Sequence, residues 1–239
     1  MFQFIEKETK RTTKGRNNKV ITIGGMIGAG KSTITKLLSE ELGYEPMYES
    51  VDDNEILPLF YTASPEEQIA KRYPFLLQLE FLNSRYSIIK EALRGDQNVV
   101  MDRSIYEDWY FAKINTEIGN ISVQEFNIYE KLLNNMMEEL DELPKKSPDI
   151  MVYLKISFEK TLERIGKRGR DFEQDEGLYD YYYRLWKDYD DWIMNHYEHS
   201  NVLIIDMDQI DVEANPEQIS LIIEQIKKAE LKLPGKTLG

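Results

Sequence analysis

A run of glycines that ends in a lysine and a serine carries the residue types and spacing in this sequence that most directly predict chemistry. The apolar stretch Ile21–Ile23 leads into these glycines. Glycine lets backbone N–H groups curl around phosphate oxygens, where a Cβ would obstruct the approach or resist positive φ. Lys31 would reach the β- and γ-phosphates, and the Ser32 hydroxyl would ligate Mg²⁺. The residues expected around the phosphates are Gly25, Met26, Ile27, Gly28, Ala29, Gly30, Lys31, Ser32 and Thr33.

The segments on either side of these glycines are those that a P-loop requires. A β-branched run precedes them, and residues 32–42 have the composition of a helix that Gly43 would end. The positive N-terminal end of this helix would point at the same anion. A glycine-rich turn that only matches the pattern would lack this context, so the sequence predicts a bound nucleoside triphosphate.

Composition limits the class of protein. The 239 residues suit one α/β domain over 19–239, preceded by a polar tail over 1–18 that we expect to be mobile. A net charge of −13 argues against a nucleic-acid partner and favours a small substrate. The absence of cysteine excludes disulfides and thiolate chemistry, and no apolar run reaches the roughly 18 residues of a membrane span. We therefore expect a cytoplasmic protein without a membrane partner.

Two acidic positions follow predicted strands and are candidates for the reaction centre. Glu49 ends a short strand over 44–49, and Asp102-Arg103-Ser104 follows a strand over 98–101. Ligands of open α/β sheets bind at the carboxyl ends of the strands, so both segments should lie near the γ-phosphate. Asp102 could hold Mg²⁺ through water, and Arg103 could clamp phosphate or orient Glu49. A solvated glutamate and a helix-capping Asp-Arg ion pair are the alternatives.

A long helix is predicted over 74–93 from apolar residues at three- and four-residue spacing. Gln78 and Arg85 project from the same side of it, beside this apolar stripe. Their polar groups could read the edge of a nucleobase, or could be rim residues bonded to a neighbouring loop. A second predicted helix, over 122–140, follows a capping box and is interpreted as structural.

A basic segment interrupts this acidic chain. Four cations fall within residues 164–170 beside two glycines, and we expect a short arginine-rich lid over about 164–177. Such a lid would close over phosphates and supply positive charge during phosphoryl transfer. The alternative is a solvated charge run balanced by the acidic residues that follow it.

In order and placement, the glycine motif, Tyr48-Glu49, Asp102-Arg103-Ser104 and Arg168-Gly169-Arg170 resemble the deoxynucleoside kinase family, closest in appearance to its bacterial deoxyadenosine and deoxyguanosine kinases. The resemblance extends from about Lys19 to Asp208. It implies a P-loop kinase fold, with a five-stranded parallel sheet between two layers of helices. It also implies transfer of the γ-phosphate of ATP to the 5′-hydroxyl of a deoxynucleoside in nucleotide salvage, with Mg²⁺, in a homodimer.

The resemblance assigns roles to individual residues. Glu49 would accept the proton of the 5′-hydroxyl, and Lys31, Arg103 and Arg170 would share the catalytic work. Ser32 and Asp102 would hold Mg²⁺. The residues expected to contact the deoxynucleoside are Glu49, Tyr61, Gln78, Arg85, Arg103, Asp108 and Glu173. Arg164, Arg168, Arg170 and Asp208 would contact the donor nucleotide. The insertion Ser64–Gln68 and Phe172 depart from the pattern of animal members.

Two other functions remain as alternatives. A thymidylate-type nucleoside monophosphate kinase would need extra cations for the acceptor phosphate and would avoid a carboxylate such as Glu49 beside it. A regulatory GTP-binding module would need an Asn-Lys-x-Asp and an Asp-x-x-Gly element, and neither occurs in a suitable place. Among deoxynucleosides a purine is expected, although Gln78, Arg85 and Asp108 can satisfy several donor and acceptor patterns.

Overall fold

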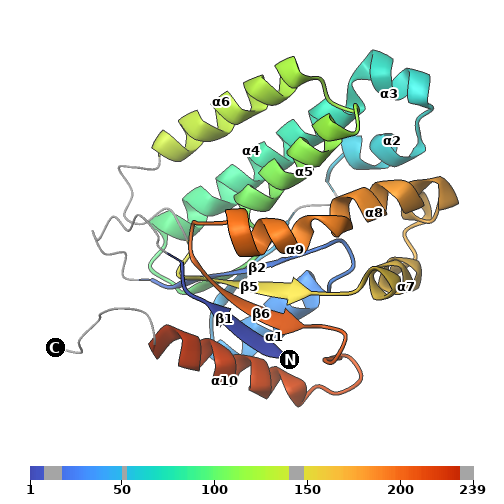
Figure 1. Ribbon diagram of the computed structural model, residues 1–239. Coiled ribbons are helices and arrows are strands. Elements are labelled where there is room, and N and C mark those ends of the chain that lie inside the picture. The colour runs from blue at the N-terminus through green and yellow to red at the C-terminus, as the bar shows by residue number, and fades with distance from the viewer. Residues whose placement is uncertain (8–17, 50–52, 140–147, 232–239) are drawn as a thin grey trace.

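The computed structural model describes residues 1–7, 18–49, 53–139 and 148–231, which form a β-sheet covered by helices on both faces (Figure 1). Its strands are β1 (Phe2–Ile5), β2 (Val20–Gly25), β3 (Glu45–Met47), β4 (Val99–Asp102), β5 (Ile150–Lys155) and β6 (Asn201–Asp206). Its α-helices are α1 (Lys31–Leu42), α2 (Ile56–Thr62), α3 (Pro65–Lys71), α4 (Tyr73–Arg94), α5 (Ile105–Glu117), α6 (Val123–Glu139), α7 (Phe158–Arg168), α8 (Tyr179–Lys187), α9 (Tyr189–Asp191) and α10 (Gln218–Leu231). The short turns η2 (Asp171–Glu173) and η3 (Glu176–Leu178) follow α7, and η4 (Trp192–His196) follows α9.

The sheet has six described strands in the order β1-β6-β5-β2-β4-β3. The five strands from β2 to β6 are parallel, as the sequence predicts. The sequence predicts five strands, but the structure has a sixth: β1 pairs antiparallel with β6, and Phe2 lies opposite Ile205. The prediction of a mobile tail over residues 1–18 is therefore wrong for Phe2–Ile5, whereas residues 8–17 lie outside the described part. Phe2, Phe4 and Ile5 pack against the main core, so apolar burial favours this pairing.

The central strands are apolar because both of their faces are covered. All six residues of β2 are buried, as are the first five of β5. In Figure 1, α1 and α10 lie on one side of the sheet, and α4, α5, α8 and α9 lie on the other. Within the described ranges, no helix has the length and apolar character needed to cross a bilayer.

The sheet order places the chemistry at one edge. Strand β2 lies between β4 and β5, and β3 lies beyond β4, so the carboxyl ends of β2, β3 and β4 are neighbours. The glycine motif, Glu49 and Asp102 follow these three ends. Helix α1 begins directly after the glycines and ends at Leu42; its C-cap Gly43 is left-handed (φ 68°) and donates its N–H to the Ser39 carbonyl. The predicted stop at Gly43 is confirmed.

Candidate functional site

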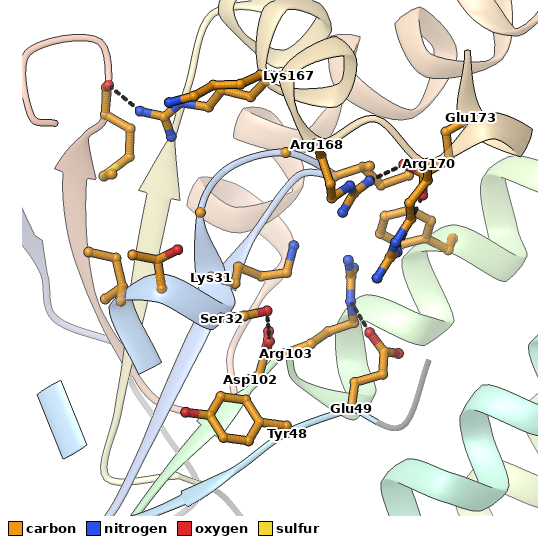
Figure 2. A pocket seen from close by; sticks show the side chains of 18 of the residues that line it. Lys31, Ser32, Tyr48, Glu49, Asp102, Arg103, Lys167, Arg168, Arg170 and Glu173 are labelled. Atoms are coloured by element: carbon orange, nitrogen blue, oxygen red, sulfur yellow. Dashed lines mark hydrogen bonds and ion pairs between the residues drawn. The ribbon is translucent and has the colours of Figure 1, made fainter. Parts of the chain in front are cut away.

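A cavity of about 550 Å³ opens at this edge of the sheet. Its lining combines the glycine motif, the ends of β3 and β4, helices α4, α5 and α7, and the segment after α7. Figure 2 shows labelled lining side chains of several of these segments around one space: Lys31 and Ser32, Glu49, Asp102 and Arg103, and Arg168 and Arg170. The cavity is therefore assembled from every segment that the sequence singled out for chemistry.

The glycine motif forms a cradle around the Lys31 side chain. The Nζ atom of Lys31 donates to the carbonyls of Gly25 at 2.9 Å and Met26 at 2.8 Å. Gly28 adopts φ 79°, and a Cβ there would lie 3.1 Å from the Thr161 carbonyl oxygen, so both conformation and space favour glycine. Burial lowers the pKa of Lys31 to about 7. An arriving phosphate would supply the charge that stabilises the protonated amine.

The first hydroxyl of α1 meets the carboxylate at the end of β4. Ser32 Oγ donates to Asp102 Oδ2 at 2.5 Å. Asp102 is 4% exposed, and its Oδ1 atom has no hydrogen-bond partner within the described part of the chain. A hydroxyl beside an unsatisfied carboxylate oxygen is a hard-oxygen donor set of the kind that Mg²⁺ shares with substrate phosphates. The two residues fit the predicted metal.

The Glu49 carboxylate lies between two arginines. Its Oε1 accepts from Arg85 at 2.6 Å, and its Oε2 lies 3.7 Å from Arg103 Nε. Burial opposes ionisation of Glu49, but Arg85, Arg103 and Lys31 outweigh it and hold the carboxyl pKa below its usual value. Glu49 is therefore ionised at neutral pH and lines the cavity, where a carboxylate can accept a proton (Figure 2).

The three residues predicted to read a base are brought together by α4 and α5. Arg85 is 1% exposed and donates to Asp108 at 3.2 Å, to Glu49, and to the Asp102 carbonyl at 2.6 Å. Burial raises the pKa of Asp108 to about 6 against the pull of Arg85. Gln78 is 2% exposed and lines the cavity, and its Oε1 atom is unsatisfied among the described residues. An unsatisfied amide oxygen at the wall of a cavity is a ready hydrogen-bond acceptor.

The arginines of the predicted lid divide between a helix and the turns after it. Arg164 and Arg168 belong to α7, and Arg170 follows it. Arg164 donates to the Ala29 carbonyl at 3.0 Å and so contacts the glycine motif directly. Arg168 and Arg170 both pair with Glu173, the latter at 3.5 Å. These two side chains are about a third exposed, in contrast to Arg85.

Some predicted site residues do not line the cavity: Gly25, Met26, Ala29, Arg85 and Asp208. The Gly25 N–H donates to the Glu107 carboxylate at 2.9 Å, so it does not point to a phosphate. Asp208 is not among the cavity-lining residues; its carboxylate accepts from the backbone N–H and hydroxyl of Ser157, the N-cap of α7. Tyr61 lines the cavity and stacks on Phe172 with ring centroids 5.6 Å apart.

Sequence reasoning missed several residues of the site. Phe111 and Tyr181 line the cavity, and the Arg103 guanidinium lies 4.7 Å from the Phe111 ring centroid. Phe111 could have been found, because it lies three residues after Asp108 and so shares its face of α5. Nothing in the sequence places Tyr181 at the cavity, because α8 reaches the site only through the packing of distant segments.

Comparison with known proteins shows which protein family this chain is similar to in sequence. A sequence model described as "Deoxynucleoside kinase" matches residues 21–230. A deoxyguanosine kinase of Lactobacillus johnsonii is 48% identical over 220 residues, which cover 91% of this chain and 94% of the relative. A deoxyadenosine kinase of Lactobacillus acidophilus is 43% identical and covers 87% of this chain and 94% of its own length.

Solved structures show the same likeness. A deoxyadenosine kinase from M. mycoides, solved with its products dCMP and a flexible dCDP, superposes with a TM-score of 0.72 at 32% identity. It covers 87% of this chain and 99% of its own length. The structure of that kinase with bound dATP gives a TM-score of 0.71 at 31% identity.

Proposed function

Since the chain belongs to the deoxynucleoside kinase family, we propose that it transfers the γ-phosphate of ATP to the 5′-hydroxyl of a purine deoxynucleoside. One observation carries the proposal: Lys31, the arginines of α7 and of the segment after it, and the buried carboxylate of Glu49 line one cavity. Phosphoryl transfer needs positioning and positive charge around a loose transition state more than covalent help. The cavity has both, with a proton acceptor on its opposite side.

The reaction uses the two sides of the cavity together. The 5′-oxygen of the deoxynucleoside forms a bond to the γ-phosphorus while the bond to the β,γ-bridging oxygen breaks. Glu49 accepts the hydroxyl proton, and the electron pair of the broken bond stays on the β-phosphate. Lys31 and Arg170 stabilise the charge on the transferring group, and Arg103 holds the Glu49 carboxylate in place.

Mg²⁺ would be held by Ser32 and, directly or through water, by Asp102. When bound, it neutralises charge on the β- and γ-phosphate oxygens. The described residues contain no group of three or more acidic or histidine ligands able to hold a metal without substrate. That composition suits an ion that arrives with the donor nucleotide.

An uncharged acceptor suits the cavity better than a nucleoside monophosphate. Arg85 donates to two carboxylates and a carbonyl, and Arg103 pairs with Glu49. An acceptor phosphate on this side would compete with those carboxylates and would lie against the ionised Glu49. The thymidylate-type alternative therefore has less support.

The base side supports a purine. Gln78 and Asp108 line the cavity with an amide and a carboxyl group, the buried Arg85 donates to Asp108 at 3.2 Å, and the apolar side chains of Leu77 and Phe111 line the same space. Such a set can pair with the edge of a purine while its rings are covered by apolar surface. The relatives named above as deoxyguanosine and deoxyadenosine kinases point the same way.

We also propose that the enzyme acts as a cytoplasmic homodimer associated through α4 and α6. Ile128 and Leu132, one turn apart on α6, are 51% and 38% exposed, and Leu76 on α4 is 40% exposed. Exposed apolar residues on adjacent helices are typical of an interface between subunits. Light scattering coupled to size exclusion would give twice the chain mass of 28.2 kDa, and a single chain mass would contradict the dimer.

The proposed reaction is tested with the purified protein, ATP and Mg²⁺ against each of the four deoxynucleosides and their four monophosphates. Products are separated by ion-exchange chromatography. Deoxyguanosine or deoxyadenosine should give the 5′-monophosphate with the highest kcat/KM, and the monophosphates should not react. Phosphorylation of the monophosphates alone would refute the proposal.

A further inference from the structure

Glu107 is a buried carboxylate that joins the glycine motif to the Asp-Arg-Ser segment. It lies in the first turn of α5 and is 0% exposed. Its Oε1 accepts from the Gly25 N–H at 2.9 Å and from the Tyr189 hydroxyl, and its Oε2 accepts from the Ser104 N–H at 2.7 Å. The Arg103 guanidinium lies 4.0 Å from Oε1. Four groups from three separate segments therefore meet at one side chain.

Capping of α5 explains only part of this arrangement. A capping-box glutamate needs the bond to the N-cap N–H, which Ser104 provides, and such residues usually stay solvated. A carboxylate taken wholly out of water is costly unless donors replace the water. Here the Gly25 N–H and the Tyr189 hydroxyl are the additional donors, and Arg103 supplies a positive charge. Arg103 lines the cavity, and Gly25 belongs to the glycine motif.

The backbone of Arg103 and the peptide group of Gly25, both in contact with Glu107, are each held by further hydrogen bonds. Arg103 has a left-handed backbone, with φ 73°, which is uncommon for a residue other than glycine. Hydrogen bonds on both sides fix this turn: Arg103 N–H donates to the Ile23 carbonyl at 2.9 Å, and the next N–H, of Ser104, donates to Glu107. The Gly25 peptide group is also held twice, by Glu107 at its N–H and by Lys31 at its carbonyl.

We propose that Glu107 is a positioning residue. It holds the Arg103 side chain next to Glu49, and through the Gly25 N–H it fixes the glycine motif relative to Arg103. It touches neither reacting group; it acts through Arg103 and Gly25. This inference rests on the proposed phosphoryl transfer, because Arg103 matters only if Glu49 is the proton acceptor. The glutamate thereby ties the donor side of the cavity to the acceptor side.

The test compares Glu107→Gln with Glu117→Gln. Glutamine keeps the size of the side chain, but its amide nitrogen cannot accept the second backbone N–H and it carries no charge for Arg103. Glu117 lies on the same helix and pairs with Lys113 and Arg184 at the surface, so it is the matched control. We expect Glu107→Gln to lower kcat by about 10²-fold while both KM values stay within about threefold, because positioning is lost rather than binding.

The acid limb of the pH–rate profile is a second readout. If Arg103 shifts away from Glu49, the Glu49 carboxyl loses a cation that lowers its pKa, so the limb moves to higher pH in Glu107→Gln and not in Glu117→Gln. Tyr189→Phe removes one donor to Glu107 and leaves both backbone bonds; it should cause a smaller loss of kcat, about tenfold. Tyr189→Phe carries the test if Glu107→Gln does not fold.

Hydrogen–deuterium exchange separates this inference from the proposed function, since it needs no turnover. Peptides that cover the Gly24–Gly28 backbone should exchange faster in Glu107→Gln than in the wild type and Glu117→Gln. Wild-type protein that phosphorylates no deoxynucleoside would refute the proposed function. The exchange experiment would still show whether Glu107 holds the Gly25 backbone. Unchanged kcat, unchanged acid limb and unchanged exchange, corrected for folded fraction, would refute the role of Glu107.

Discussion

The cavity has two charged regions that differ in how they are held. On the acceptor side, Glu49, Arg85, Arg103 and Asp108 are almost wholly buried and bond to one another. On the lid side, Arg168 and Arg170 are about a third exposed, and within the described residues their ion pairs are with Glu173. Buried charges in a closed network cannot move without a large cost, whereas partly exposed arginines can reorient cheaply.

This difference assigns the regions different tasks. The acceptor side is preorganised, so its residues support both stability and chemistry. In the proposed reaction the lid would supply charge only when a triphosphate is present, so its residues would support chemistry alone. Variants in the two regions should therefore separate when activity and the free energy of unfolding are measured together.

Arg170→Ala should have the largest effect on activity and almost none on folding. We expect kcat to fall by about 10³-fold or more, as for an arginine finger supplied within the chain. The free energy of unfolding should change by less than about 0.5 kcal/mol, because the side chain is about a third exposed and Arg168 still pairs with Glu173. Steady-state kinetics and urea unfolding measure the two quantities. Arg184→Ala, which removes an arginine of similar exposure on α8, is the control, and activity of Arg170→Ala within severalfold of wild type would refute the role.

Glu49→Gln should lower kcat by about 10³-fold through loss of the general base. The variant should still bind deoxynucleoside with similar affinity in calorimetry, because an amide oxygen can accept the same hydrogen bond. Glu45→Gln is the matched control, since Glu45 is exposed and lies on β3, four residues earlier. If Glu49→Gln keeps its turnover, the proton acceptor is another group.

Arg85→Leu should lower the free energy of unfolding by about 3 kcal/mol or more, because it leaves Glu49 and Asp108 buried without their shared cation. Urea unfolding with a fixed m-value measures the change. This contrasts with the small effect expected for Arg170→Ala. Equal stability losses in the two variants would remove the distinction between the buried network and the lid.

Lys31 should make stability depend on pH. Burial lowers its folded-state pKa to about 7, so between pH 7 and its unfolded value the unfolded chain carries a proton that the folded chain lacks. The free energy of unfolding should therefore rise with pH, by about 2 kcal/mol between about pH 7 and pH 9 from this group. The difference between wild type and Lys31→Met isolates it. A difference that does not vary with pH would contradict the lowered pKa.

The parts of the fold that local sequence determines could be predicted. The glycine motif requires left-handed glycines next to a helix, and parallel strands end at one edge, so Glu49 and Asp102 had to lie near Lys31. The pairing of β1 with β6 could not be predicted, because Phe2 and Ile205 are distant in sequence and only burial joins them.

The contacts of the site could not be predicted from the sequence where they depend on burial. A glutamate at the start of α5 has the sequence pattern of a cap, and nothing local indicates that Glu107 is wholly enclosed and receives the Gly25 N–H. The pairing of Arg85 with Glu49 also depends on the angle between α4 and β3, which sequence does not give. For the same reason the sequence assigns Asp208 to the nucleotide, whereas its carboxylate accepts hydrogen bonds from Ser157, the N-cap of α7.

A crystal structure with deoxyguanosine and a non-hydrolysable ATP analogue tests the central claim most directly. We expect a Glu49 carboxylate oxygen at about 2.6–3.2 Å from the 5′-oxygen, the range for a general base, with the γ-phosphate beyond it toward Lys31. A 5′-oxygen out of reach of Glu49, with the carboxylate still closed onto Arg85 and Arg103, would contradict it.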